Sequence, residues 1–274
     1  MATFDLAFEQ AVAKSTPASL SDIREKQVVG TPLEKLFGAV DNFEFDPSRL
    51  VVSATVVGEQ YRTLKANIAH LGRSGGLGSI VFTSSLKGEG KTTVVVNLAR
   101  ELAREPAAKI AVVDCDFKRP GMSDFCSVEP DAGIEDVLSG AASLEECGVY
   151  SRRDRFVVFG LRHHGEDTGD LLASASLQRV IGELEAMFDL VLIDTSPVLS
   201  TSEPVVLGAK AGAVVLVVRA GVTQRESVLF AQAQLEQAGC RLLGVVINAR
   251  PSYLPRLWLL RKYEYFPDAY RHKG

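Results

Sequence analysis

The sequence predicts an α/β fold in which a mostly parallel central sheet is flanked by helices. Short runs such as "SIVFTS" and "GAVVLVVRA" are apolar and rich in β-branched residues, as is typical of strands buried on both faces. These runs alternate with segments of helical periodicity, and this alternation favours parallel pairing of the strands. Ligands of such sheets bind beyond the carboxyl ends of the strands, so functional residues are expected after Ser84, Asp114, Asp194 and Ile247.

The predicted elements follow one another from residue 56 onward. A first helix, "GEQYRTLKANIAHLG", places Tyr61, Leu64, Ile68 and Leu71 on one face. Strands are expected at "SIVFTS", "KIAVVDCD", "RFVVFG", "DLVLIDTS", "GAVVLVVRA" and "RLLGVVINA". Further helices are expected from Lys91 to about Arg104 and at "GIEDVLSG", "SASLQRVIGELEAMF" and "TQRESVLFAQAQLEQAG".

Three regions are expected along the chain. Residues 1–46 form an N-terminal extension that is partly disordered, with a short helix at "TPLEKLFGAV", or else a docking segment for a partner. Residues 47–249 form the α/β domain. Residues 250–274 form a flexible tail that holds four of the six tyrosines.

The composition narrows the functional classes. The chain of 274 residues is 46% hydrophobic and 23% charged, which allows a sizeable core. The net charge of -4 argues against nucleic-acid binding over the whole surface. The four cysteines form no CxxC pair, so reduced thiols in a cytoplasmic protein are expected rather than disulfides or zinc. No apolar run reaches the roughly 18–20 residues that cross a bilayer, and no signal peptide is apparent.

The loop "SSLKGEGKTT" lies between a strand and a helix, and this context supports a phosphate-binding loop over a purely structural turn. It departs from the pattern G-x-x-x-x-G-K-[ST] only at the first glycine, where Ser85 stands. Backbone N–H groups at such glycines face phosphate oxygens, Lys91 can bridge the β- and γ-phosphates, and the Thr92 hydroxyl can bind Mg²⁺. The residues expected to hold the nucleotide are Lys87, Gly88, Glu89, Gly90, Lys91, Thr92 and Thr93.

Acidic residues follow two of the predicted strands. Asp114 and Asp116 end "VVDCD", where one carboxylate can polarise a hydroxyl and the other can orient Mg²⁺, unless they merely cap a loop. Asp194, at the end of "VLID", is the expected second anchor of Mg²⁺. Asn248 could offer its amide to the edge of a purine, or be an ordinary turn asparagine.

Two other polar groups remain open to interpretation. Lys118 and Arg119 could neutralise phosphate charge or contact a neighbouring subunit. His163 and His164 form a histidine pair with too few further ligands for a metal site, so a solvated loop is expected there.

Three motifs carry a family resemblance. "TSSLKGEGKTT", "VVDCDFKRP" and "VLIDTSP" resemble, in this order, the Walker A, Walker A′ and Walker B motifs of the bacterial tyrosine kinases, or BY-kinases, the CpsD/CapB and Wzc-like cytoplasmic domains. The wider class is the MinD/ParA-like P-loop ATPases, whose signature lysine would stand where this chain has Leu86. Lys87 stands one residue later, where BY-kinases carry proline, so the loop resembles the kinase branch.

The resemblance implies an active site that uses ATP and Mg²⁺. Lys91 and Thr92 would hold Mg·ATP, while Asp116 and Asp194 would help to place the metal. Asp114 would activate a tyrosine hydroxyl on the tail of a neighbouring subunit. The implied phosphoacceptors are Tyr263, Tyr265 and Tyr270.

The resemblance also implies an assembly. "GEQYRTLKANI" is similar to the family helix whose Glu-x-x-Arg-x-x-Arg pattern builds a ring, and here the pattern reads Glu59, Arg62 and Lys65. The implied partners are a separate membrane polysaccharide copolymerase, or chain-length determinant, and a cognate tyrosine phosphatase. The protein would then be cytoplasmic and peripheral to the inner face of the membrane.

Three functions are therefore weighed. The first is an autophosphorylating tyrosine kinase that regulates exopolysaccharide or capsule synthesis. The second is a MinD/ParA-like ATPase that positions a cargo, and the third is a nucleotide-binding regulatory subunit with little catalysis. The tyrosines at the end of the chain favour the first, because a cargo-positioning ATPase has no need of them.

Overall fold

A computed structural model of the chain describes residues 33–40, 50, 55–73, 76–122, 131–162, 172 and 175–249. The strands are β1 (Gly38–Val40), β2 (Ser79–Ser84), β3 (Ile110–Cys115), β4 (Gly148–Ser151), β5 (Phe156–Phe159), β6 (Leu190–Thr195), β7 (Ala213–Arg219) and β8 (Leu242–Asn248). The helices are α1 (Leu33–Leu36), α2 (Val56–Arg73), α3 (Lys91–Leu102), α4 (Ile134–Ser139), α5 (Leu144–Cys147), α7 (Ala175–Met187), α8 (Glu203–Lys210) and α9 (Arg225–Gln237).

Within the described residues, eight strands form one sheet in the order β1-β4-β5-β3-β6-β2-β7-β8. The strands from β5 to β8 in this order are parallel, whereas β4 pairs antiparallel with β5 and parallel with β1. The predicted mostly parallel sheet is confirmed. All six predicted strands are present, and β1 and β4 are additional strands at one edge.

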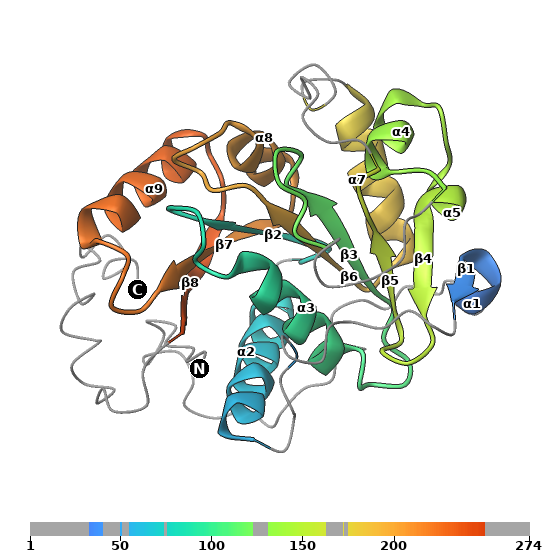
Figure 1. The fold of residues 1–274 in the computed structure, drawn as a ribbon, viewed down its shortest axis with the longest axis horizontal. Coiled ribbons are helices and arrows are strands. Elements are labelled where there is room, and N and C mark those ends of the chain that lie inside the picture. The colour runs from blue at the N-terminus through green and yellow to red at the C-terminus, as the bar shows by residue number, and fades with distance from the viewer. Residues whose placement is uncertain are drawn as a thin grey trace.

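Helices cover both faces of the sheet (Figure 1). On one face, α2 and α3 pack through residues such as Tyr61, Leu64 and Val95 against alternate strand residues such as Phe82. On the other face, α4, α7, α8 and α9 pack against the intervening strand residues, such as Val81. Because successive side chains of a strand point to opposite faces, a strand covered on both sides is apolar throughout, as the sequence pattern indicated.

The segment 33–40 belongs to the sheet rather than lying apart from it. The helix expected at "TPLEKLFGAV" is the single turn α1, and the chain then forms β1, which the sequence did not predict. Phe37 lies between them, is 2% exposed, and stacks on Phe188 while meeting the ring of Phe159 edge to face, each at 5.7 Å between centroids. Residues 1–32 and the tail 250–274 lie outside the described residues.

The sheet order brings the predicted site loops together. β3, β6, β2, β7 and β8 are consecutive and parallel, so their carboxyl ends lie along one edge. Within the described chain, no helix is both long enough and apolar enough to span a bilayer.

Candidate active site

The loop between β2 and α3 has the backbone of a phosphate cradle. Gly88 and Gly90 have φ of +81° and +88°, in the left-handed region that favours glycine. A Cβ on Gly90 would also overlap the amide of Asn248. Ser85 is fully buried and has no positive φ, so a serine fits where the common pattern has glycine. Gly90 precedes α3, so the helix N-terminus faces the cradle.

The carboxylate of Glu89 holds this loop in shape. It is 3% exposed, accepts a hydrogen bond from the Leu86 N–H at 2.9 Å, and accepts another from the Thr223 hydroxyl. The carbonyl of Glu89 accepts a hydrogen bond of 2.9 Å from the Asn248 amide. Glu89 was predicted to bind the nucleotide; its side chain is occupied within the loop, so its backbone is the part available to phosphate.

Lys91 and Thr92 begin α3 and face two carboxylates. The Thr92 hydroxyl donates a 2.5 Å hydrogen bond to Oδ2 of Asp194. Burial raises the pKa of both Asp116 and Asp194, and the positive charge of Lys91 opposes this rise at both carboxylates. Gly121 packs directly against the side chain of Thr92, so closely that a Cβ at Gly121 would overlap the threonine hydroxyl. Lys91 is itself 8% exposed, and this enclosure strengthens its field at the site.

Asp194 and Asp114 lie side by side on neighbouring strands. They are register partners between β6 and β3, and both are fully buried. The pKa of Asp194 is raised to about 7, mainly by burial and to a smaller extent by the nearby Asp116, although Lys91 and the hydrogen bond from Thr92 oppose the rise. Oδ1 of Asp194 is buried and accepts no hydrogen bond from any residue that the structure describes.

Asp114 and Asp116 differ in their access to the site. Both oxygens of Asp114 accept backbone hydrogen bonds, from the N–H of Asp116 at 3.0 Å and of Met122 at 2.9 Å. Burial and the neighbouring Asp194 raise the pKa of Asp114 well above its usual value. Asp116 is only partly buried, and its pKa is raised by burial but lowered by Lys91 and the Arg119 N–H.

The donor set fits Mg²⁺ bound together with a nucleotide. Among the described residues, no three His, Cys, Asp or Glu side chains gather into a protein-only metal site. Mg²⁺ in nucleotide sites takes one or two protein oxygens and completes its shell with phosphate and water. Thr92 and Asp194 supply such oxygens, and the unpartnered Oδ1 of Asp194 is the kind of buried acceptor that a cation satisfies.

Some site residues were not found from the sequence. Thr223 and Arg219 support the loop from the end of β7, with the Arg219 guanidinium donating to the Gly88 carbonyl at 3.3 Å. Their position at the carboxyl end of a predicted strand was the one sequence feature that could have indicated a role at the site. Asn248, predicted to meet a purine, binds the loop through Nδ2 and its neighbour's N–H through Oδ1. Its contact with a base stays a prediction.

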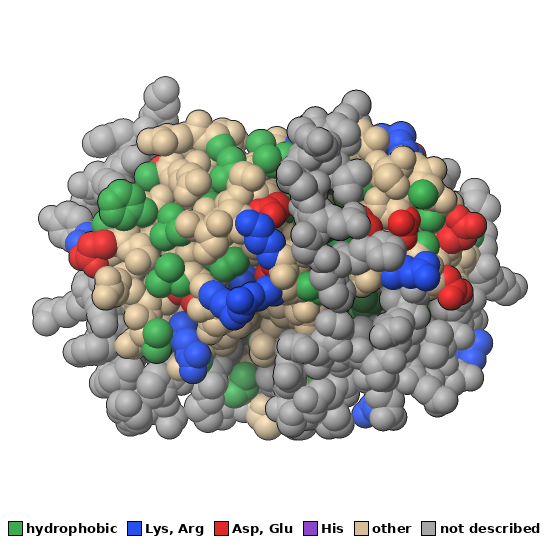
Figure 2. Space-filling view, turned by 45° about the horizontal axis from the view of Figure 1, so that its top comes forward, with side chains coloured by type: hydrophobic (Ala, Val, Ile, Leu, Met, Phe, Trp, Pro, Cys, Tyr) green, Lys and Arg blue, Asp and Glu red, His purple; other side chains and the backbone are tan. Residues whose placement is uncertain are grey.

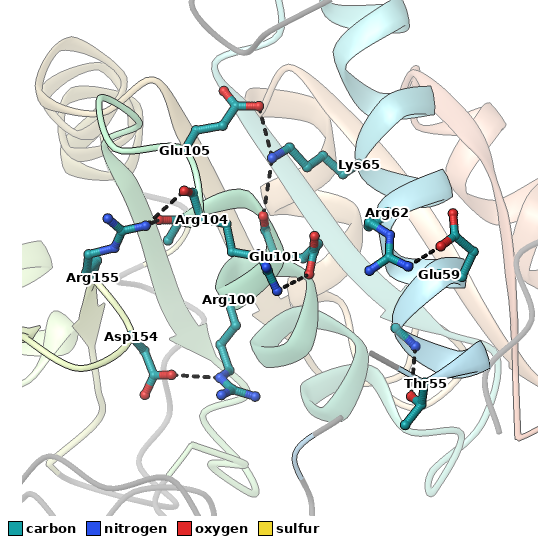
Figure 3. Close-up of polar contacts among 12 residues, drawn as sticks. Thr55, Glu59, Arg62, Lys65, Arg100, Glu101, Arg104, Glu105, Asp154 and Arg155 are labelled. Carbon is teal, nitrogen blue, oxygen red and sulfur yellow. Dashed lines mark hydrogen bonds and ion pairs between the residues drawn. The ribbon is translucent and has the colours of Figure 1, made fainter. Parts of the chain in front are cut away.

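The three residues of the predicted ring motif have different partners (Figure 3). Glu59 and Arg62 form an exposed ion pair on α2. Lys65 instead turns to α3, where its ammonium lies 2.9 Å from the Glu105 carboxylate and donates to the Glu101 carbonyl at 3.3 Å. The ion pair of Lys65 therefore joins two helices of one subunit.

Two other predicted groups fall outside the described residues: the histidine pair His163 and His164, and the predicted phosphoacceptors Tyr263, Tyr265 and Tyr270.

Comparisons with known proteins identify the family of the chain. The AAA domain family matches residues 78–228. Tyrosine-protein kinase YwqD of Bacillus subtilis is 30% identical over 70% of this chain and 81% of its own. Tyrosine-protein kinase CpsD of Streptococcus pneumoniae is 34% identical over 69% of this chain and 83% of its own.

Solved structures share the fold. The kinase domain of Escherichia coli tyrosine kinase ETK has a TM-score of 0.64 at 22% identity, covering 77% of this chain and 86% of that chain. The cell division ATPase MinD of Pyrococcus furiosus has a TM-score of 0.50 at 27% identity, covering 62% and 71%.

The fold and the loop define a P-loop ATPase of MinD/ParA-like architecture, which uses ATP. Within that class, the chain belongs to the bacterial tyrosine-protein kinases, as the motif resemblance had implied.

Proposed function

We propose that this chain is a Mg²⁺-dependent autokinase that phosphorylates tyrosines in the C-terminal tail of a neighbouring copy. The observation that carries the proposal is the hydrogen bond from Thr92 to Asp194, together with the charge of Lys91, which acts on both Asp194 at the end of β6 and Asp116 after β3. An ATPase needs the same loop, but the tyrosines Tyr263, Tyr265 and Tyr270 supply an acceptor that such an ATPase does not require.

The loop and helix α3 would hold the triphosphate. Backbone N–H groups around Gly88 and Gly90 bind its oxygens, and Lys91 neutralises charge on the β- and γ-phosphates. Thr92 and Asp194 would hold Mg²⁺, which offsets the charge that develops between the β- and γ-phosphates. The predicted metal role of Asp116 is supported by its nearness to Lys91 and Asp194.

In the transfer step, the oxygen of the acceptor tyrosine forms a bond to the γ-phosphorus. The bond from that phosphorus to the bridging β–γ oxygen breaks, and ADP leaves. The tyrosine proton passes to a carboxylate of the pair Asp114 and Asp116. Asp114 is the predicted base, but the partial exposure of Asp116 supports Asp116 as the carboxylate that meets the hydroxyl.

The test uses two complementary variants of the full chain with Mg·ATP and phosphotyrosine detection. A Lys91→Met chain keeps its tyrosines but lacks the catalytic lysine, and a chain with Tyr263, Tyr265 and Tyr270 changed to Phe keeps only the kinase. Neither should label itself, whereas the mixture should label the Lys91→Met chain. ATP hydrolysis by the unaltered chain without any phosphotyrosine would instead establish the cargo-positioning ATPase.

The two candidate bases are separated by Asp114→Asn and Asp116→Asn in the same assay. Loss of the base should lower the transfer rate by about 10²–10⁴-fold and flatten its rise with pH. If Asp116→Asn alone flattens the profile, Asp116 is the base and Asp114 holds the loop. The opposite result restores the predicted role of Asp114.

Transfer between copies requires an assembly, for which we propose the ring. The exposed Glu59 and Arg62 would form contacts between subunits, whereas Lys65 is occupied within its own subunit. Arg62→Glu should lower both the oligomer mass measured by light scattering and the labelling between copies. An unchanged mass would argue against this part of the proposal.

The cellular setting follows from the family resemblance alone. We propose regulation of exopolysaccharide or capsule synthesis and export, with a separate membrane copolymerase as the partner and a cognate phosphatase. The protein would then lie in the cytoplasm at the inner face of the membrane. Because residues 33–40 belong to the sheet, residues 1–32 remain the candidate docking segment of the expected extension 1–46. Pull-down of the full chain but not of a chain beginning at residue 33 by the copolymerase's cytoplasmic part would support this.

A further inference from the structure

The exposed charges around the active site are positive. In the loops after β2, β3, β6 and β7, the carboxylates of Glu89 and Glu203 are buried and that of Asp116 is half-buried. In the phosphate loop, in residues 116–122 and at the end of β7, the exposed charged residues are all cations, and we call them the cationic rim: Lys87, Lys118, Arg119 and Arg219. Asp131, further along the loop after β3, is exposed and acidic and does not belong to this set. Figure 2 shows Lys and Arg side chains gathered toward the middle of one face of the molecule.

Contacts with the loop and with Asp116 place the rim around Lys91. Lys87 lies in the phosphate loop, and the Arg219 guanidinium donates to the Gly88 carbonyl of the same loop at 3.3 Å. Lys118 and Arg119 follow Asp116, whose Oδ1 accepts a hydrogen bond from the Arg119 N–H at 3.1 Å and on which the charge of Lys91 acts. No described carboxylate forms an ion pair with the four rim side chains.

In the C-terminal tail, which supplies the proposed acceptor tyrosines, negative charge is concentrated around Tyr265. Its sequence reads "RKYEYFPDAYRHKG" from Arg261. The nearest charged residues on the two sides of Tyr265 are Glu264 and Asp268, both acidic. Tyr263 directly follows two cations, and Tyr270 directly precedes Arg271, so each has a cation as a neighbour.

We propose that the cationic rim selects acceptor tyrosines with carboxylates on both sides, and that Tyr265 is therefore phosphorylated first. This inference rests on the proposed transfer to the tail. Single exposed charge pairs contribute little, but several pairs together reach about tenfold in substrate selection. The cationic rim would bind the acceptor segment, whereas Lys91 would bind the phosphates of ATP.

The test uses peptides spanning residues 258–274 in which Tyr265 is the only tyrosine. The enzyme is the chain with Tyr263, Tyr265 and Tyr270 changed to Phe, so that it lacks the three proposed acceptors. Replacing Glu264 by Gln and Asp268 by Asn in the peptide should lower kcat/KM about tenfold, mainly through KM. Equal values for the acidic and neutral peptides would overturn the proposal while leaving the kinase activity established.

Variants of the rim complete the design. Lys118→Glu combined with Arg119→Glu should remove the preference for the acidic peptide and leave the KM for ATP within about twofold. Lys210→Glu, at the end of α8, is the matched control and should keep the preference. A rise in the KM for ATP with an unchanged preference would assign the rim to the nucleotide and refute the selection of acceptors.

The order of phosphorylation is read on the chain itself. Mass spectrometry of the Lys91→Met acceptor at early times should find phosphate at Tyr265 before Tyr263 and Tyr270. Equal early labelling at the three positions would contradict the inference. Absence of phosphotyrosine on both the chain and every peptide would instead refute the proposed function.

Discussion

Asp194 shows how burial prepares a side chain for a cation. It lies at the end of β6 with one oxygen bound to Thr92 and the other without a hydrogen bond among described residues. Burial raises its pKa to about 7, so the uncharged form is favoured more than in an exposed aspartate. A bound cation would stabilise the charged form and satisfy the open oxygen.

Asp194→Asn is expected to stabilise the protein at pH 8 in the absence of Mg²⁺. The pKa of an aspartate in the unfolded chain is about 4, so native Asp194 binds its proton more tightly than unfolded Asp194 does. The free energy of unfolding therefore falls as the pH rises from about 4 to about 7. Asp194→Asn removes this fall, so it should raise the free energy of unfolding at pH 8 by roughly 1–3 kcal/mol. Near pH 4 the substitution should leave the free energy of unfolding unchanged. Urea unfolding at pH 8 and pH 4 measures both values.

Asp131→Asn, at an exposed position, is the control and should change the stability little at either pH. With Mg·ADP present, the unaltered chain should gain stability and Asp194→Asn should gain much less. Lower stability of Asp194→Asn at pH 8 without Mg²⁺ would contradict this account of the carboxylate.

At the scale of single residues, the sequence could predict which backbone positions form the cradle but not where every side chain turns. Gly88, Gly90 and Lys91 are tied to a local pattern, and the structure has the expected strand, loop and helix there. The carboxylate of Glu89 turns to Thr223, which is 134 residues away in sequence. Such a contact depends on the register of β7 beside β2, which no local pattern encodes.

At the scale of elements, the end of α3 is capped from another part of the chain. Arg155, which has φ of +61°, donates to the carbonyls of Ala103 and Arg104 at 2.7 and 2.9 Å. These carbonyls lie at the helix C-terminus, where partners within the helix are missing and a cation is favoured. Arg100 reinforces the contact through its 2.7 Å ion pair with Asp154 (Figure 3).

Two substitutions at Arg155 should separate the contribution of the helix cap to stability from the cost of the left-handed backbone. Arg155→Ala removes the hydrogen bonds and keeps the left-handed backbone, so we expect a loss of about 1–2 kcal/mol. Arg155→Gly removes the same bonds but relieves the backbone, so it should be about 1 kcal/mol more stable than Arg155→Ala. Denaturant unfolding measures the difference, and equal stabilities would show that the positive φ carries no strain.

The elements that the sequence missed are short or partly polar. β4 has four residues and β1 has three, and both are held in the sheet by pairing with neighbouring strands. β1 is the edge strand and pairs with β4. α8 begins directly after the loop "SPVLSTS", whose serines and proline indicate a turn. The long periodic helices and the apolar strands were predictable because burial dictates their pattern.

At the scale of the whole molecule, the expected boundary at residue 46 divides the sheet from its edge strand. Phe37 fills the space against Phe159 and Phe188, and a Cβ on Gly148 would overlap its ring. Removal of residues 1–46 would therefore open the core at β4, whereas removal of residues 1–32 leaves α1 and β1 in place.

A chain that begins at residue 33 should unfold at nearly the same urea concentration as the full chain. A chain that begins at residue 47 should lose about 3 kcal/mol or more, and Phe37→Ala in the full chain should lose a similar amount. Leu36→Ala is the matched control, because Leu36 is 36% exposed. Equal stability of the two shortened chains would restore the boundary at residue 46.

Asn248 is the last residue of β8 and also the side chain that holds the carbonyl of Glu89. Its own oxygen accepts the N–H of Ala249, which turns the chain with φ of +55° into the segment that begins at residue 250. The root of the tail and the phosphate loop are thus anchored to one amide group. A force that pulls on the backbone after Ala249 would therefore reach the phosphate loop through the side chain of Asn248.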